Sequence, residues 1–298
     1  MKNRLLKLMQ NYLHRISVVK RLSYLPGHFH SPVVMIEEIE NQIDQIFKIQ
    51  DALPLAIEIN ETEQIDLLNK LENYYGSLPF KHEKQSGLRY YYNNDYFSYN
   101  SGIQLFTIIR HFRPQRIVEI GSGFSSSLIL DTNDIFFNGT IHCTFIEPNP
   151  DRLLSLLTQE DHKNHIILTK KVQDVEIEHF KKLEENDILF VDSSHVSKTG
   201  SDLNHIVFNI LPILNKGVII HFHDIFYPFE YPKDWVMTQG GFGWNEIYLL
   251  RAFLMYNNSF KILFFNSYME YFYKDWFLAH MPDCLTRQGG SLFIVKTK

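Results

Sequence analysis

Residues 116–127, RIVEIGSGFSSS, decide the fold of this chain. The apolar residues within 117–120 predict a short buried strand of a parallel sheet. Gly121 and Gly123 predict a tight turn in which the backbone can come close to a ligand. The serines after the turn suit the first turn of the apolar helix that follows. A strand, a glycine turn and a helix N-terminus together form a corner of the kind that binds nucleotides.

Glu119 and Ser126 indicate which kind of ligand this corner suits. Glu119 lies two residues before Gly121, where a carboxylate would repel a pyrophosphate but would attract a cation. Ser126 stands where the dinucleotide-binding pattern has its third glycine. Both features favour a sulfonium ligand over a nicotinamide dinucleotide. A Gly-x-Gly turn alone is a weak signal, so an ordinary turn between a strand and a helix stays an alternative.

Length and composition limit the classes of protein to consider. The 298 residues allow one large α/β domain with an appendage, or two modest domains. A formal net charge of -5 argues against a nucleic-acid binder, which would normally present a basic face. The two cysteines imply no disulfide framework, and Cys143 is expected to be a buried thiol in a reducing, cytoplasmic compartment. No apolar run approaches the roughly 20 residues that cross a bilayer.

Residues 1–85 are expected to form a helical region ahead of a second domain over 86–298. Apolar residues at helical spacing predict a basic amphipathic helix over 1–21, and further helices over 36–48 and 61–75. For residues 1–21 we favour a helix packed on its own domain or on a second copy of the chain in a homo-oligomer. A helix on a membrane surface is the alternative.

Beyond residue 86, strands and helices alternate, which predicts a mostly parallel, doubly wound sheet of the α/β class. Strands are expected over 117–120, 140–146, 165–169, 187–191, 217–222, 260–265 and 291–296. Helices are expected over 101–112, 151–157, 177–183, 203–214 and 245–256. Ligands of such sheets bind outside the carboxyl ends of the strands. Solvation alone hardly explains the polar residues at or just past those ends, which are Glu119, Glu147, Asp174, Asp192, His195, His223 and Asp224.

Two of these positions suit the nucleoside part of a ligand. Glu147 ends the second strand, where a carboxylate can accept hydrogen bonds from both hydroxyls of a ribose. Gln173 and Asp174 follow the third strand, where side chains can meet the edge of an adenine. The structural alternatives are a surface turn at Glu147 and a helix N-cap at Asp174.

Together these residues resemble the successive motifs of class I S-adenosylmethionine-dependent methyltransferases. The order and spacing of the motifs carry the resemblance, which covers residues 86–298: Glu119-x-Gly121-x-Gly123, Glu147, Gln173-Asp174 and Asp192. The resemblance implies a Rossmann-like sheet of seven strands with the last one antiparallel. It also implies a cofactor site. In that site Glu119 and the turn Gly121-Ser122-Gly123 lie near the methionine part of the cofactor, and Glu147 binds the ribose. Gln173 and Asp174 meet the adenine, and Asp192 is a further cofactor-binding residue.

The residues after the fourth and fifth strands are similar in layout to catechol O-methyltransferase and to metal-dependent sugar O-methyltransferases. This similarity implies a divalent cation held by Asp192, His223 and Asp224, and it places His195 where the catechol enzyme carries a lysine base. Two residues depart from the pattern, since His223 stands where an oxygen ligand is usual and His195 replaces the lysine. A metal-free site with His195 or His223 as general base stays open, as does a structural His-Asp pair.

The sequence therefore predicts an S-adenosylmethionine-dependent methyltransferase, with Mg or another divalent cation as a second cofactor, that acts on a hydroxyl of a small molecule or glycan. Aromatic loops over 89–97, 226–232 and 240–246 are candidates for the walls of its pocket, or else structural aromatic clusters. Two other classes stay open. One is an oxidoreductase that uses an NAD-type nucleotide at the same corner, and the other is a non-catalytic binding or scaffold protein with the same fold.

Overall fold

The structure is a computed structural model that describes residues 23–25, 27–48, 54–237 and 243–298. The basic helix expected over 1–21 lies outside these residues. The chain divides into two compact units. Among the described residues, the smaller unit combines 23–25 and 27–48 with 232–237 and 243–244, and the larger combines 54–231 with 245–298.

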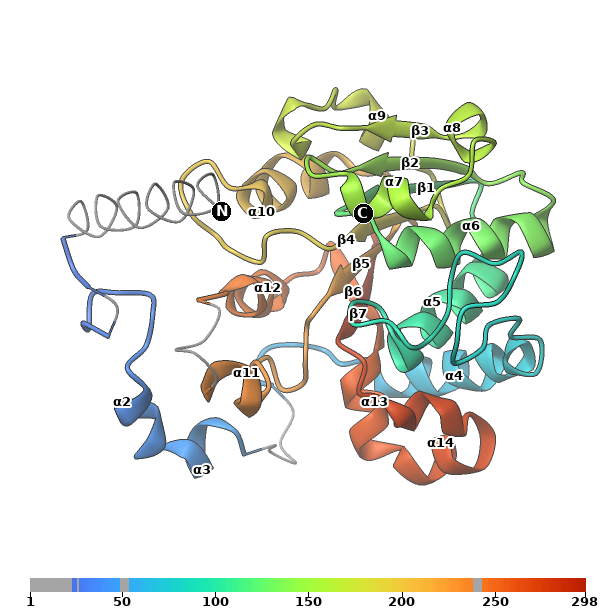
Figure 1. Ribbon diagram of the computed structural model, residues 1–298. Helices are drawn as coiled ribbons and strands as arrows, with labels where there is room; N and C mark the ends of the chain where they lie inside the picture. The colour runs from blue at the N-terminus through green and yellow to red at the C-terminus, as the bar shows by residue number, and fades with distance from the viewer. Residues whose placement is uncertain (1–22, 26, 49–53, 238–242) are drawn as a thin grey trace, which may run out of the picture. The chain divides into compact units, whose positions relative to one another are not determined.

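A seven-stranded sheet forms the centre of the larger unit. Its strands are β1 (Arg116–Ile120), β2 (His142–Ile146), β3 (Ile166–Leu168), β4 (Ile188–Val191), β5 (Ile219–His223), β6 (Phe260–Phe265) and β7 (Ser291–Lys296). The strand order is β3-β2-β1-β4-β5-β7-β6 (Figure 1). β7 runs antiparallel to β5 and β6, and the other four pairings are parallel. The predicted Rossmann-like, doubly wound sheet with an antiparallel last strand is confirmed.

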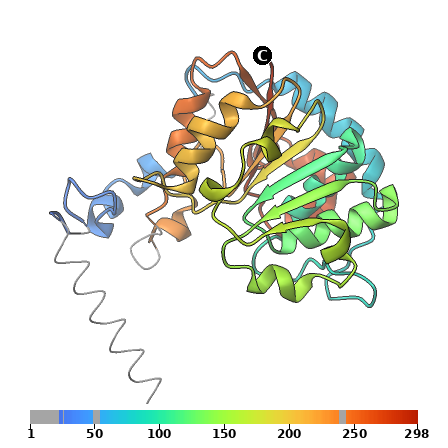
Figure 2. The same ribbon diagram turned by 90° about the horizontal axis from the view of Figure 1, so that it is seen from above.

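Helices cover both faces of this sheet. Those of the larger unit are α4 (Glu61–Tyr75), α5 (Tyr99–Phe112), α6 (Phe124–Phe137), α7 (Asp151–Leu156), α8 (Asp161–Asn164), α9 (Glu178–Lys181), α10 (Asp202–His205), α12 (Glu246–Leu254), α13 (Asn266–Phe272) and α14 (Lys274–His280). α5 and α6 lie on one face, and α10 and α12 lie on the other (Figures 1 and 2). The smaller unit contains α2 (Ile36–Glu40), α3 (Ile43–Ile46) and α11 (Lys233–Met237). Of the helices described, none has both the length and the apolar composition that a membrane crossing requires.

Two predicted helices are broken where the sequence suggested continuity. The helix expected over 36–48 is two short helices, and at the break the side chain of Asn41 donates to the carbonyl oxygen of Glu37 at 2.9 Å. Such a bond competes with the helix backbone. The helix expected over 203–214 changes from α10 to a π turn over Ile206–Ile210 and a 3₁₀ turn over Leu211–Ile213. Pro212, which has no backbone N–H, lies in that last turn.

Three central strands, β1, β4 and β5, place the site because they are almost completely buried. All residues of β4 and β5 are buried, and so are four of the five in β1. A strand covered on both faces has a near-continuous apolar sequence, as in Ile188-Leu189-Phe190-Val191. Only the carboxyl ends of these strands and the loops that follow are available for a ligand.

The outer edge of the sheet at β6 is covered by α4 and by Asn60, the N-cap residue just before this helix. Asn60 donates from Nδ2 to the carbonyl oxygen of Ile262 at 3.1 Å. Gln64 accepts from the backbone N–H of Phe265 at 2.7 Å. Because α4 packs on β6 and α5, it belongs to the larger unit, and the division into units does not fall at residue 85, where the sequence suggested it.

Candidate active site

The glycine turn after β1 is fixed by its contact with the end of β4. Gly121 has a φ of +80°, a conformation that L side chains rarely adopt, and a Cβ atom there would lie 1.8 Å from the carbonyl oxygen of Asp192. Its N–H donates to the carbonyl oxygen of Ile146 at 2.9 Å. The turn therefore joins the carboxyl ends of β1, β2 and β4 at one point, and only glycine fits there.

Glu119 lies beneath this turn, among the serines at the start of α6. Its side chain is 0% exposed and accepts a hydrogen bond from the hydroxyl of Ser126, whose Oγ in turn accepts from the N–H of Gly123 at 2.9 Å. Burial raises the pKa of Glu119 to about 8, although hydrogen bonds from nearby serines oppose this rise. Glu119 thus supports the turn from below through one oxygen, while its Oε1 has no hydrogen-bond partner among the described residues, and its expected place near the methionine part of the cofactor stays a prediction. Ser126 stands in place of a third glycine because it forms this bridge.

A cavity of about 400 Å³ opens beside the turn. Its lining includes Gly121, Glu147, Gln173 and Asp192 from the predicted cofactor set, together with Ser193, Ser194, Lys171 and Lys198. Glu119, Ser122, Gly123 and Asp174, which were also expected to bind the cofactor, are not among its lining residues. Asp174 is exposed in a 3₁₀ turn over Val172–Asp174, and it does not act as the N-cap of α9, which is Ile177.

Two side chains at the rim have groups that can meet a nucleoside. The carboxylate of Glu147 accepts from the backbone N–H of Ser122 at 3.2 Å and from that of Asn149 at 2.7 Å, so it is held in place at the end of β2. Gln173 donates from Nε2 to the carbonyl oxygen of Gly200 at 3.0 Å. Its Oε1 is buried and has no hydrogen-bond partner among the described residues. A buried acceptor without a donor suits the amino group of a purine.

The polar-aromatic loop ahead of α5 reaches the same corner. The rings of Tyr91 and Tyr96 lie 5.6 and 5.9 Å from that of Phe124, the first residue of α6. The guanidinium of Arg152 lies 3.5 Å from the ring centre of Tyr96, in a cation–π contact. A Cβ atom on Gly123 would lie 3.2 Å from Cδ of Arg152. The loop therefore packs against the start of α6, and both alternatives, a cover for a ligand and a structural aromatic cluster, stay open.

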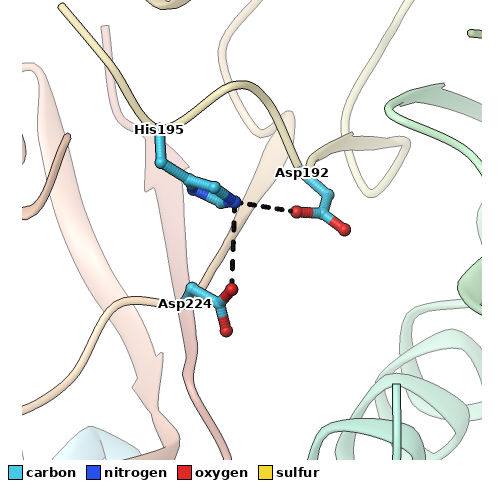
Figure 3. A group of neighbouring side chains, drawn as sticks. All are labelled: Asp192, His195 and Asp224. Carbon is cyan, nitrogen blue, oxygen red and sulfur yellow. Dashed lines mark ion pairs between the residues drawn. The ribbon is translucent and has the colours of Figure 1, made fainter. Parts of the chain in front are cut away.

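A second cluster lies beside the cavity, at the ends of β4 and β5. Nε2 of His195 lies 3.2 Å from Oδ1 of Asp192 and 3.8 Å from Oδ2 of Asp224 (Figure 3). One donor atom from each of these three residues lies within 4.8 Å of the others. His195 and Asp224 both have a φ of +58°, which is unusual outside glycine and is found where surrounding contacts hold a residue in a strained conformation.

The other ring nitrogen of His195 contacts the last residue of the loop 240–246, which the sequence offered only as a candidate wall of the pocket. Nδ1 lies 2.6 Å from Oε2 of Glu246, at the start of α12. Burial by itself would lower the pKa of His195, but the hydrogen bonds with Asp192 and Glu246 raise it well above its usual value. The imidazole of His195 thus lies between the carboxylates of Asp192 and Glu246.

His223 is not in the group that the structure brings together, although it was an expected metal ligand. Its Nε2 lies 3.4 Å from Oδ1 of Asp224, and its ring lies 5.1 Å from that of Phe97. His221 and His223 are two residues apart on β5, with rings 5.9 Å apart, so they continue the alternation of the strand. Asp224, the next residue, does not continue the alternation because its φ is +58°. The cluster with metal-ligand geometry among the described residues is Asp192, His195 and Asp224.

Sequence reasoning missed Arg152, and it included Glu246 only in the candidate pocket wall 240–246, without a role of its own. Both occur in the first turn of a helix, where an acidic or basic residue has no distinctive pattern. A helix that begins directly after an aromatic-rich loop was the one signal for Glu246.

Comparisons with known proteins agree with this geometry. A family model described as a methyltransferase domain matches residues 118–225, a range that contains the glycine turn and both aspartates of the cluster. A protein of Archaeoglobus fulgidus, described as uncharacterized, is 36% identical over 182 residues, which are 58% of this chain and 81% of that protein.

Two solved structures show a weaker similarity. One is the SAH-bound methyltransferase PaMTH1 of Podospora anserina, with 17% identity and a TM-score of 0.45, where the match covers 93% of this chain and 100% of that one. The other is the O-methyltransferase TomG of Streptomyces achromogenes in complex with SAM, with 12% identity and a TM-score of 0.40, where the match covers 82% of this chain and 93% of that one.

Proposed function

Because residues 118–225 match the model of a methyltransferase domain, this chain belongs to the class I S-adenosylmethionine-dependent methyltransferases, and we propose that it methylates a hydroxyl of a small molecule or glycan, with His195 as the proton acceptor. One observation carries the proposal: Asp192 lines the cavity beside the glycine turn and also lies 3.2 Å from Nε2 of His195. A cofactor in the cavity and a hydroxyl at His195 would therefore lie on two sides of the same carboxylate.

The cavity suits the cofactor in three respects. Gly121 lines the cavity without a side chain, Glu147 offers a fixed carboxylate to the ribose hydroxyls, and Gln173 offers a buried acceptor to the adenine amino group. When bound, S-adenosylmethionine supplies the methyl group, whose bond to the sulfonium sulfur breaks as the bond to the acceptor oxygen forms, leaving a neutral thioether. The residues of this chain orient it and manage the proton.

His195 has the surroundings that a proton acceptor for a hydroxyl needs. An alcohol is a very weak acid at neutral pH, so removal of its proton must be assisted. Nε2 of His195 takes that proton in our proposal, and the ring becomes an imidazolium. The contacts with Asp192 and Glu246 stabilise this cation and raise the pKa of His195 well above its usual value, so the ring is largely protonated at neutral pH. We therefore expect turnover to rise with pH as the neutral ring, which can accept a proton, becomes populated.

A second candidate, transfer assisted by a divalent cation, is favoured by the three donor atoms within 4.8 Å of one another. Asp192, His195 and Asp224 would hold the cation, with His195 in the place expected for His223. Two carboxylates and an imidazole suit manganese, iron or zinc better than magnesium, which prefers oxygen. A cation there would lower the pKa of a coordinated hydroxyl.

One experiment tests both candidates. The full chain is given methyl-labelled S-adenosylmethionine and a panel of catechols, phenols and monosaccharides, with and without EDTA. We expect His195→Ala to lower turnover by about 10²–10⁴-fold, while its affinity for S-adenosylhomocysteine in calorimetry stays close to that of the wild type. Indifference to EDTA keeps the proton acceptor and excludes the cation, whereas a loss that manganese or magnesium restores supports the cation.

Two outcomes would contradict the proposal. Undiminished transfer by His195→Ala would remove this residue from the chemistry. Transfer to nitrogen or sulfur acceptors alone would show that the acceptor group is not a hydroxyl.

A further inference from the structure

Arg152, in the first turn of α7, lies against the second glycine of the turn after β1. A Cβ atom on Gly123 would lie 3.2 Å from Cδ of Arg152 and 3.9 Å from its Nη1. The central carbon of the guanidinium lies 3.5 Å from the ring centre of Tyr96. The ring of Tyr96 is itself stacked on that of Phe124, at 5.9 Å with an angle of 11° between the planes. Two aromatic rings and a guanidinium thus form one stack beside the start of α6.

This stack holds the guanidinium without using its hydrogen-bond donors. Arg152 is exposed, and among the described residues its guanidinium has no hydrogen bond and no ion pair. At stacking distance, Tyr96 contacts the face of the guanidinium, whereas the N–H donors point outward from its edge. A planar cation with open donors along one edge suits a carboxylate, which it can bind through two parallel hydrogen bonds.

The loop that carries Tyr96 is held in place by contacts of its own. At its start, the side chain of Arg89 bonds to the carboxylate of Asp161 at 2.7 and 2.9 Å. Within it, Oδ1 of Asn94 accepts from the N–H of Tyr96 at 3.1 Å. The ring is therefore in place before any ligand binds, and the guanidinium of Arg152 is pre-organised on it.

The glycine turn has an acidic neighbour at one glycine and a basic neighbour at the other. A Cβ atom on Gly121 would lie 3.4 Å from Cβ of Asp192, whereas the neighbour of Gly123 is Arg152. Gly121 and Asp192 also line the cavity of about 400 Å³. A ligand that reaches from this cavity across the turn would meet a negative charge first and a positive charge next. An amino-acid group, with one charge of each sign, matches that order.

We propose that Arg152 binds the α-carboxylate of the amino-acid part of S-adenosylmethionine, and that Tyr96 holds the guanidinium in place for it. This inference rests on the proposed cofactor site, in which the nucleoside lies at Glu147 and Gln173 and the rest of the molecule extends across the turn. Arg152 takes no part in the proton transfer. Its contact makes the site selective for adenosyl ligands that carry the carboxylate.

The test is calorimetry on the full chain with two ligands, S-adenosylhomocysteine and its analogue without the α-carboxylate. The wild type should bind the analogue about 5–50-fold more weakly than S-adenosylhomocysteine, as expected for one charge-assisted contact near the surface. Arg152→Gln should weaken the binding of S-adenosylhomocysteine by about the same factor and leave the affinity for the analogue unchanged. Arg152→Lys keeps the charge but not the planar fork, so it should recover part of the loss.

Lys198→Gln is the matched control, because Lys198 is an exposed cation that lines the same cavity. Removal of its charge should change the affinities for the two ligands by the same factor. A difference confined to Arg152→Gln would therefore separate contact with the carboxylate from the general charge of the cavity. Tyr96→Ala should reproduce part of the effect of Arg152→Gln, whereas Tyr96→Phe, which keeps the ring, should not.

Equal losses of both ligands in Arg152→Gln would overturn the inference, and so would a wild type that binds both ligands equally well. Failure of the proposed function would look different. An active His195→Ala would contradict the proton acceptor and would leave these affinities as they are. Unchanged binding by Glu147→Ala would remove the ribose from that carboxylate, whereas a selective loss in Arg152→Gln would still place the carboxylate at Arg152.

Discussion

Glu119→Gln tests whether the carboxyl beneath the glycine turn is protonated in the folded protein. Glutamine has nearly the shape of a protonated glutamate, and its Oε1 can still accept from the hydroxyl of Ser126. Burial raises the pKa of Glu119 from 4.5 to about 8. The folded chain therefore binds a proton more tightly than the unfolded chain does, and the wild type should lose stability as pH rises between these two values.

The size of the effect follows from the two pKa values. At roughly 1.4 kcal/mol for each pH unit between them, keeping Glu119 ionised in the folded chain costs about 5 kcal/mol. Relative to Glu119→Gln, the wild type should lose about 2 kcal/mol of unfolding free energy between about pH 6 and pH 8. Urea denaturation of both proteins across this range measures the difference directly, and Glu178→Gln on the surface controls for the loss of an exposed carboxylate.

Two results would refute this reasoning. A constant difference between the wild type and Glu119→Gln across the range would mean that Glu119 does not titrate there. A wild type that becomes more stable with rising pH would mean that the carboxyl is charged and satisfied in the folded chain.

Three further predictions concern the turn, the rim and a buried ion pair. Gly121→Ala should abolish S-adenosylhomocysteine binding in calorimetry and lower the melting temperature, because its Cβ would overlap the backbone of Asp192; binding at wild-type affinity would show that the turn can move. Glu147→Ala should weaken that binding by about 1.5–3 kcal/mol, the usual contribution of hydrogen bonds to a charged group, and unchanged affinity would remove Glu147 from the site. Asp161→Asn should cost about 1–3 kcal/mol of unfolding free energy at neutral pH, since Asp161 bonds to Arg89 at 2.7 and 2.9 Å and its pKa is lowered by that contact despite burial. Its contribution is present above the ordinary aspartate pKa and is lost as pH falls through the lowered pKa of the folded chain, so the gap between the two proteins should narrow as pH falls below about 3.9. A gap that stays constant there would point to packing instead.

Much of the fold was accessible from the sequence because apolar periodicity is a local property. The bounds expected for β6, β7 and α4 agree with the structure, and those of the buried parallel strands differ by three residues at most. The glycine turn was also accessible, since its φ of +80° and its close approach to β4 are requirements that glycine meets.

The site was accessible only in part, because its geometry depends on side-chain direction and on residues far apart in the chain. Asp192 and Asp224 were placed correctly at the rim, since β4 and β5 are neighbours. The sequence placed His223 in the cluster, whereas the structure places His195 there. This depends on the positive φ angles of His195 and Asp224 after the strands, which no sequence pattern specifies. Glu246 lies 51 residues from His195, and nothing short of the folded chain brings the two together.

The cover over β6 has a consequence for shortened forms of the protein. A chain that began at residue 86 would lack Asn60 and Gln64, and with them the bonds to the carbonyl of Ile262 and to the N–H of Phe265. Those backbone groups would then stand open along a strand at the border of the sheet, where a second chain can pair with them. Such a fragment would keep every residue of the site and yet be prone to aggregate. Asn60 and Gln64 thus keep the edge strand β6 from pairing with a second copy of the chain.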